Sequence, residues 1–150
     1  MALRAATLAD VPAIRALTRA AYAKWVPLIG REPAPMTADY EEAVQAHRID
    51  LLDQEGELLA LIETVLREDH LWIENVAVAP ARQGKGHGSA LLAHAEALAR
   101  TAGRGETRLL TNAAFTANIA LYERLGYAVT TREEFPGRGI AVFMAKRLAA

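Results

Sequence analysis

A strand that runs through a glycine-rich loop into a helix is the feature of this sequence that most constrains its fold. Residues 71–78 are largely apolar, Pro80 marks the end of the strand, and glycines follow at positions 84, 86 and 88. Apolar residues then recur at helical spacing up to a stop at Gly103. Glycines let a backbone approach a ligand closely, and the unpaired N–H groups at a helix N-terminus favour an anion. The stretch therefore predicts a site for a phosphate group.

The spacing of these glycines excludes two common phosphate-binding motifs. A P-loop requires Gly-x-x-x-x-Gly-Lys followed by Ser or Thr, which the chain lacks. A dinucleotide fingerprint requires Gly-x-Gly-x-x-Gly, whereas the order here is Gly84-x-Gly86-x-Gly88. We therefore expect a different phosphate-bearing ligand.

Composition narrows the class of protein further. A length of 150 residues favours a single domain spanning residues 1–150, and a hydrophobic content of 52% favours a compact fold. The net charge of −1 gives no electrostatic reason to expect nucleic acid or a membrane as a partner. The chain has no cysteine, and its histidines lack the spacing of metal ligands, so we expect no metal. No apolar run reaches the ~18 residues of a membrane span and no signal peptide is recognisable, which predicts a cytoplasmic protein.

Hydrophobic periodicity predicts the element order βααβββαβαββ. The expected strands cover residues 3–6, 49–52, 58–66, 71–78, 107–111, 127–131 and 140–146, and the expected helices cover 10–24, 37–47, 88–102 and 115–125. Asp10 and either Thr37 or Asp39 are the expected N-caps of the first two helices. Because a helix joins them, strands 71–78 and 107–111 are expected to be parallel. In the last helix, the expected buried stripe is Ala117, Leu121 and Leu125.

The segment after the first helix has unusual properties for a loop. Pro27, Gly30, Pro33 and Pro35 interrupt any regular element there. Loops normally face water, but this segment and its ends also carry four large apolar residues, Trp25, Leu28, Ile29 and Met36. Two interpretations stay open: these side chains pack on the core, or they form a lid or wall of a substrate pocket.

Two motifs about 30 residues apart resemble those of one known family. The loop reads Gln83-x-x-Gly86-x-Gly88, and further on the chain reads Asn118-x-x-Ala-x-Tyr122-x-x-x-Gly126-Tyr127. Both are similar to segments of the GCN5-related N-acetyltransferase (GNAT) family, and the whole element order matches that family too. The resemblance implies an α+β fold, in which helices flank a twisted mixed sheet that splits at a central parallel strand pair.

The resemblance also implies acetyl-CoA as the acetyl donor, with its pantetheine arm in the split of the sheet. Main-chain groups of Val76 and Val78 would bind the arm, and N–H groups of the glycine loop would hold the pyrophosphate. Lys85 and Arg82 either add positive charge there or simply face solvent. The full set of residues predicted to bind the donor is Val76, Ala77, Val78, Gln83, Gly84, Lys85, Gly86, His87, Gly88, Ser89, Asn118 and Tyr122.

Acetyl transfer to an amine requires a base, a stabilised oxyanion and a protonated leaving thiolate. The N–H group of Val76 is the candidate for the oxyanion, and Tyr122, one helical turn beyond Asn118, is the candidate proton donor to the thiolate. For the base we favour Glu74, because a carboxylate in an apolar strand is costly to bury unless it is used, and burial would raise its pKa. Glu63 and a water chain are the alternatives. Without cysteine, direct transfer in a ternary complex is favoured over an acyl-enzyme.

The acceptor is the least constrained part of this interpretation. Residues predicted to contact it are Trp25, Ile29, Glu74, Asn75 and Asn112, and the resemblance adds the region of Tyr22, Tyr40, Phe135 and Arg138. We expect an N-acetyltransferase that acts on a primary amine of a small molecule or peptide, as a monomer or homodimer. The alternative is a non-catalytic domain of the same fold that binds or senses acyl-CoA.

Overall fold

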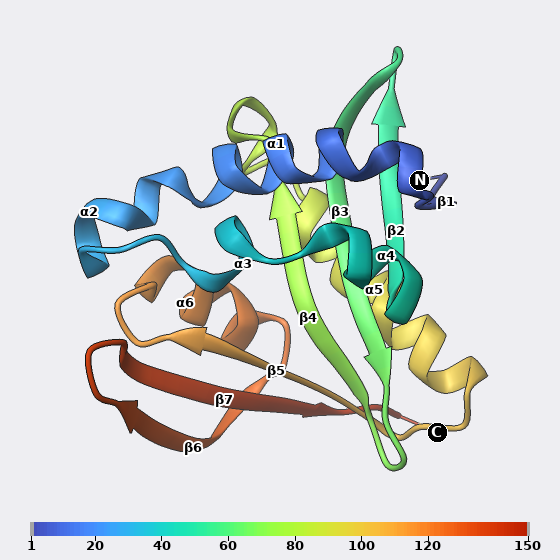
Figure 1. The fold of residues 1–150 in the computed structure, drawn as a ribbon. Coiled ribbons are helices and arrows are strands. Elements are labelled where there is room, and N and C mark those ends of the chain that lie inside the picture. The colour runs from blue at the N-terminus through green and yellow to red at the C-terminus, as the bar shows by residue number, and fades with distance from the viewer. Residues whose placement is uncertain (1, 150) are drawn as a thin grey trace.

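A seven-stranded mixed sheet forms the centre of the computed structural model, which describes residues 2–149 (Figure 1). The strands are β1 Arg4–Ala5, β2 Arg48–Gln54, β3 Glu57–Leu66, β4 Leu71–Val78, β5 Glu106–Asn112, β6 Ala128–Phe135 and β7 Gly139–Arg147. Their order in the sheet is β1-β2-β3-β4-β5-β7-β6, and only β4 and β5 pair in parallel. The fold class and the parallel pair are as the sequence predicts. Within residues 2–149, no helix is long and apolar enough to cross a membrane.

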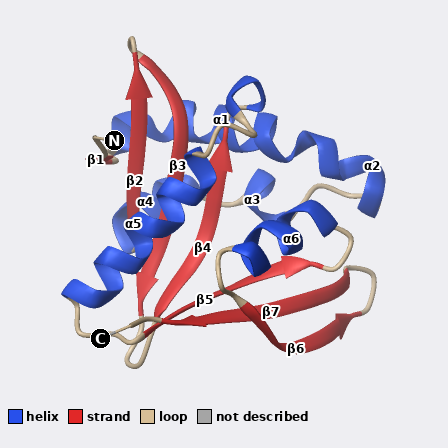
Figure 2. Ribbon diagram, turned by 180° about the vertical axis from the view of Figure 1, so that it is seen from behind, coloured by secondary structure: helices blue, strands red, loops and turns tan. Residues whose placement is uncertain are grey.

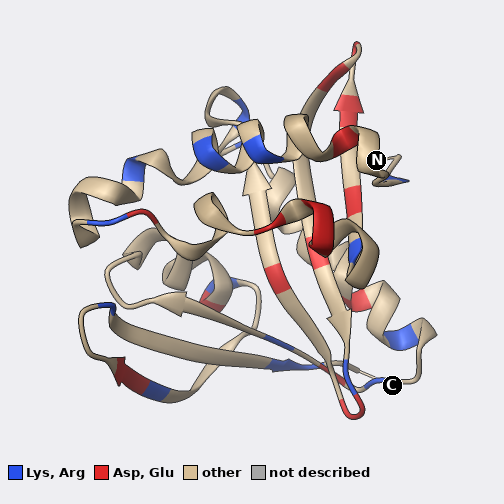
Figure 3. Cartoon of the chain, viewed as in Figure 1, with Lys and Arg blue, Asp and Glu red and all other residues tan. Residues whose placement is uncertain are grey.

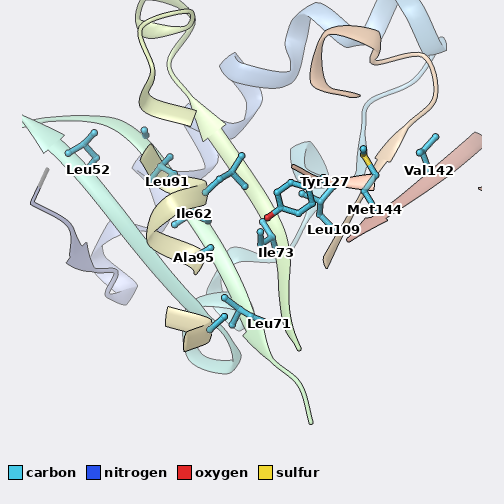
Figure 4. Packing of buried hydrophobic residues seen from close by; sticks show 13 residues of the cluster. Leu52, Ile62, Leu71, Ile73, Leu91, Ala95, Leu109, Tyr127, Val142 and Met144 are labelled. Carbon is cyan, nitrogen blue, oxygen red and sulfur yellow. The ribbon is translucent and has the colours of Figure 1, made fainter. Parts of the chain in front are cut away.

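Helices cover both faces of this sheet. α1 (Val11–Tyr22), α2 (Val26–Ile29), α3 (Ala34–Thr37) and α4 (Tyr40–Ala46) lie on the face turned toward the viewer in Figure 1. α5 (His87–Thr101) and α6 (Thr116–Arg124) lie on the opposite face, as the view from behind shows (Figure 2). Two buried clusters result, one under α1 and α4 and one under α5. Figure 4 shows the second cluster, where Leu91 and Ala95 of α5 meet strand residues such as Ile62 and Ile73.

β4 and β5 pair at one end only and then diverge. Their register joins only Leu71 to Thr107 and Trp72 to Arg108. Beyond Trp72 the two strands separate, which Figure 1 shows as an opening between β4 and β5. The split that the family resemblance implies is therefore present, and it leaves one edge of β4 open over its last six residues.

A β-bulge in β4 determines which way its side chains point. Thr64 of β3 pairs with Ile73 and Glu63 pairs with Asn75, so Glu74 is the extra residue between them. Before the bulge, Ile73 packs into the cluster under α5; after it, Ala77 packs into the cluster under α1. A bulge inserts one residue and re-aims the side chains that follow. It therefore turns Asn75 toward α1 and α4.

Two local expectations were wrong, and one open choice is resolved. The segment expected to be a loop contains α2 and α3, because a proline is tolerated in the first turn of a helix. Trp25 and Met36 are buried there, as the packing interpretation predicts, whereas Leu28 is exposed. Ala117 is exposed rather than buried, and α6 instead packs through Ile119, Tyr122 and Leu125. The second helix is capped by Asp39, whose carboxylate accepts from the Glu42 amide at 3.2 Å.

Candidate active site

A cleft of about 450 Å³ lies at the split of the sheet. Its walls come from α1, the segment of α2 to α4, the central strands β3 to β5, α6 and the β6–β7 turn. Among the predicted site residues, Ile29, Glu74, Asn75, Asn112, Asn118 and Tyr122 line it. Elements far apart in sequence therefore meet around one space beside the open edge of β4.

The glycine loop leads into the N-terminus of α5 as predicted. Gly84 and Gly86 have φ values of 77° and 86°, a left-handed conformation that side chains disfavour, and Gly86 is the N-cap of this 15-residue helix. A Cβ atom at either position would meet open space, so the glycines are required by conformation and not by crowding. A loop of this conformation at the N-terminus of a helix is the arrangement that favours an anion, so the phosphate site stays a prediction that this geometry permits.

The Gln83 side chain links the glycine loop by hydrogen bonds to the end of β4 and to Lys24. Its Nε2 donates to the carbonyl oxygen of Val78 at 3.0 Å, and its Oε1 accepts from Lys24 Nζ at 2.8 Å. Lys24, which lies just after α1, therefore places a positive charge beside the loop. Sequence reasoning missed Lys24, because nothing in its own neighbourhood distinguishes it from any other surface lysine.

The backbone of β4 directs the amides of alternate residues toward the split. The amide of Ala79 donates to Leu59 at 2.8 Å, and the register continues through Ala77 with Leu61 and Asn75 with Glu63. In an antiparallel ladder, residues between such hydrogen-bonded pairs point their N–H and C=O groups away from the partner strand. The amides of Val76 and Val78 thus face the split. Ala77 instead pairs with Leu61 of β3, and its contact with the donor stays a prediction.

Asn75 joins two tyrosines at the back of the cleft. The Tyr22 hydroxyl lies 2.7 Å from Asn75 Oδ1 and 3.2 Å from the Val76 carbonyl oxygen. Asn75 Nδ2 donates to the Tyr40 hydroxyl at 3.3 Å, and that hydroxyl donates to the Pro35 carbonyl at 2.5 Å. Burial raises the pKa of Tyr22 well above its usual value and that of Tyr40 to about 12, so both hydroxyls stay protonated at neutral pH. Asn75 is buried and bonded to both tyrosines, which makes it a positioning residue for this wall.

Two carboxylates project from the central strands, which Figure 3 shows as acidic positions on β3 and β4. Glu63 is 4% exposed, and its Oε2 lies 2.6 Å from His47 Nδ1. Burial raises the pKa of Glu63, the hydrogen bond from His47 lowers it in part, and the nearby charge of Glu74 raises it again. Glu74, by contrast, is exposed, and it accepts a hydrogen bond from Trp72 Nε1 at 2.6 Å.

The burial argument that favoured Glu74 therefore applies to Glu63 instead. Both carboxylates lie in largely apolar strands, so the sequence alone suggests the same buried environment for each. The bulge leaves Glu74 out of the pairing with β3, so its side chain reaches solvent through the cleft. Both carboxylates line the cleft, but only Glu63 has the shielded environment expected of a base.

Tyr122 stands on the α6 wall of the cleft, one turn beyond Asn118. Burial raises the pKa of its hydroxyl to about 12, so it holds its proton at any pH at which the protein works. Its ring centroid lies 5.9 Å from that of Tyr127, which is buried and whose hydroxyl pairs with Thr107 Oγ1 at 2.8 Å. Tyr122 faces the cleft and Tyr127 faces the core.

The remaining residues predicted to contact the acceptor either line the cleft or pack behind its wall. Trp25 does not line the cleft; it stacks on Phe115, with ring centroids 4.4 Å apart, and Phe115 forms the wall. Asn112 Nδ2 and Arg31 Nη2 both donate to the carbonyl of Arg138, at 3.4 and 2.7 Å. These bonds join the segment after α2 and the end of β5 to the β6–β7 turn. Sequence reasoning missed Arg31 and considered His47 only as a metal ligand.

A comparison with protein-family models decides the family. A model described as the Acetyltransferase (GNAT) family matches residues 13–127. The chain belongs to the GNAT acetyltransferase family. The match spans both walls of the split, the glycine loop and α6, which are the parts that carry the candidate site.

Solved structures with the same fold agree with this assignment. The ribosomal-protein-S18-alanine N-acetyltransferase from Escherichia coli is 26% identical, with a TM-score of 0.80 over 99% of this chain and 94% of that one. A putative acetyltransferase from Salmonella typhimurium, solved with acetyl-CoA, is 23% identical, with a TM-score of 0.72 over 100% and 95%. An N-acetyltransferase from Thermoplasma acidophilum, solved with coenzyme A, is 16% identical, with a TM-score of 0.75 over 98% and 99%. No curated protein sequence matches the chain.

These findings confirm the family and the class of enzyme that the sequence predicts. Together, the family match and the neighbours support an acetyl-CoA-dependent N-acetyltransferase. The identity between this GNAT enzyme and its structural neighbours is low, so the roles of individual residues must be argued from its own geometry.

Proposed function

We propose that this GNAT enzyme moves the acetyl group of acetyl-CoA directly to a primary amine of a small molecule or peptide, in a ternary complex. The observation that carries the proposal is the pairing of a buried carboxylate and a protonated phenol around one cleft. Glu63 and Tyr122 both line the space beside the open edge of β4. Glu63 can take a proton from an amine, and Tyr122 can give a proton to a leaving thiolate.

The donor is proposed to bind along the glycine loop and β4. The amides of residues 83–89, including Gln83, Lys85, His87, Gly88 and Ser89, lie at the N-terminus of α5, where a pyrophosphate would be stabilised. The Val78 amide would bind the pantetheine arm like an added strand, and the Val76 amide would bind the thioester oxygen at the end of that arm. Asn118 lines the same cleft and offers an amide side chain to that arm.

The chemistry is proposed to proceed in three steps. Glu63 removes a proton from the acceptor ammonium, and the free amine attacks the thioester carbonyl, forming the C–N bond. The Val76 amide donates to the oxyanion of the tetrahedral adduct. As the C–S bond breaks, the Tyr122 hydroxyl donates its proton to the departing sulfur, and the phenolate recovers a proton from the adduct nitrogen through water. One proton per turnover is left for solvent.

Replacing Gly86 with valine is expected to weaken donor binding. The residue has a φ of 86°, a conformation that costs a side-chain-bearing residue about 1–2 kcal/mol and more when it is β-branched. If the loop relaxes to relieve this strain, its amides lose their alignment, and the KM for acetyl-CoA should rise about tenfold or more. Steady-state kinetics at saturating acceptor measures this change.

Gly103→Val provides the matched control for that substitution. Gly103 has a similar φ of 73° and an equally open surrounding, but it follows the C-terminus of α5, remote from the loop. Its replacement should lower the melting temperature without changing the KM for acetyl-CoA. Equal effects of the two substitutions on KM would contradict a specific role of Gly86.

Turnover against a panel of amines tests the proposed function itself. Purified enzyme with acetyl-CoA should release free CoA in the presence of at least one class among alkylamines, amino acids and peptides with free N-termini. Mass spectrometry of the product should place the acetyl group on nitrogen. Saturable binding of acetyl-CoA without turnover on any amine would instead favour a domain that senses acyl-CoA.

A further inference from the structure

His47 lies between two separate cavities. It follows the last turn of α4, and it is among the residues that line both the cleft and a second cavity of about 460 Å³. The second cavity lies between the ends of β2, β3 and α5, where Thr64, Leu66 and Leu98 form part of its lining. The His47 side chain is 31% exposed, whereas the Glu63 side chain to which it is bonded is only 5% exposed. His47 therefore connects a buried carboxylate to water.

The proposed reaction creates a need for such a connection. Acetylation of an ammonium group by a thioester releases one net proton, and Glu63 holds this proton first. Donor and acceptor are proposed to occupy the cleft during the reaction, so a proton that leaves on another side of Glu63 avoids both of them. Among the residues that the structure describes, His47 is the one titratable side chain within hydrogen-bond distance of Glu63.

We propose that His47 passes the proton taken up by Glu63 to water in the second cavity, an inference that rests on the proposed function. While Glu63 is ionised, the Nδ1–H group of the ring donates to it across the 2.6 Å hydrogen bond. Once Glu63 has taken the acceptor's proton, exchange with water moves the ring hydrogen to Nε2, Nδ1 accepts the proton of Glu63, and the Nε2 proton passes to water. Glu63 is ionised again for the next turnover. The hydrogen that is left on Nδ1 donates to it as before.

Other charged and titratable groups around Glu63 do not offer this path. Glu74 of β4 is a second carboxylate, whose charge favours the protonated form of Glu63. Tyr22 of α1 and Tyr40 of α4 are protonated phenols, which hold their protons. Asn75, opposite Glu63 on β4, cannot titrate. Imidazole is the group that both accepts and releases a proton near neutral pH.

His47→Ala tests the relay through the pH dependence of turnover. Without the hydrogen bond that lowers its pKa, Glu63 should need a higher pH to ionise. The acid limb of kcat/KM should move upward by about one pH unit, which is about a tenfold loss of activity below that limb. Added imidazole should restore kcat, because a small imidazole can enter the space left by the side chain. KM for acetyl-CoA should stay near that of the wild type.

His47→Gln separates proton transfer from hydrogen bonding, and it also serves if the alanine variant folds poorly. Glutamine can donate to Glu63 but cannot carry a proton, so kcat should fall while the acid limb stays in place. Full activity of this variant would overturn the relay and leave His47 a purely structural partner. An alanine variant with an unchanged profile and no response to imidazole would overturn it too.

His94→Ala is the matched control for a histidine paired with a buried carboxylate. His94 Nε2 lies 3.0 Å from Asp50 Oδ2, and neither residue lines the cleft. Its replacement should leave the pH profile and the response to imidazole as in the wild type. A wild-type enzyme that acetylates no amine would overturn the proposed function. An active wild-type enzyme with unaffected His47 variants would overturn the relay alone.

Discussion

Glu63→Gln is expected to lower kcat/KM by about 10²–10⁴, the range that a general base contributes to catalysis. Glutamine has nearly the same shape, and its amide oxygen can still pair with His47. It has no lone pair of comparable basicity, so the acceptor ammonium keeps its proton and cannot attack. Affinity for acetyl-CoA, measured by calorimetry, should change little, because Glu63 lies on β3, away from the glycine loop.

The pH profile gives the same prediction a second readout. Glu63 works in its ionised form, so activity rises with pH as the carboxyl group loses its proton. Because burial raises its pKa, this rise should lie above the ordinary range of a glutamate, about 4.3. In Glu63→Gln this limb should disappear, and only the limb set by the acceptor amine should be left.

Glu74→Gln decides between the two carboxylates. Glu74 lines the cleft, is exposed and is bonded to Trp72, so its replacement should cost less activity than that of Glu63 and should affect mainly the KM for the acceptor. A larger loss in Glu74→Gln than in Glu63→Gln would return the role of base to Glu74. Near wild-type activity in both variants would identify a water chain as the route of deprotonation.

Local patterns in the sequence locate the central part of the fold closely. The strand expected at 71–78 is β4 residue for residue, and the helix expected at 88–102 is α5 displaced by one residue. Both elements have clear local sequence patterns. β4 is an apolar run that ends before a proline, and α5 has an apolar stripe between glycines. Gly86 could likewise be placed in the loop, because its backbone conformation is a local property.

The choice of base could not be made from sequence for a physical reason. Glu63 and Glu74 each stand in an apolar strand, and the difference between them arises from the bulge opposite Thr64 and Glu63. A bulge depends on how two strands pair, which the residues of one strand do not encode. His47 was overlooked for a similar reason, since its bond to Glu63 joins the end of α4 to the middle of β3. Pairings of this kind are tertiary and require the fold.

Tyr122→Phe is expected to lower kcat by about 10²–10⁴ through the loss of the proton donor to the thiolate. The aromatic ring is retained, so the wall of the cleft and its packing beside Tyr127 should persist. The acid limb set by Glu63 should be unchanged, and no alkaline limb from Tyr122 should appear in the wild type below its pKa of about 12. A donor thioester with a more acidic thiol should recover much of the lost rate, since its sulfur leaves without a proton.

Tyr127→Phe is the matched control, because it removes the same hydroxyl from a neighbouring ring that faces the core. That hydroxyl pairs with Thr107 Oγ1 in the buried interior, so its loss should cost about 1 kcal/mol of stability and little activity. If Tyr122→Phe instead lost affinity for acetyl-CoA at unchanged kcat, Tyr122 would be a contact of the donor and not its acid. If both variants lost kcat equally, the effect would come from packing of the two rings, and the proton would have to reach the sulfur from water.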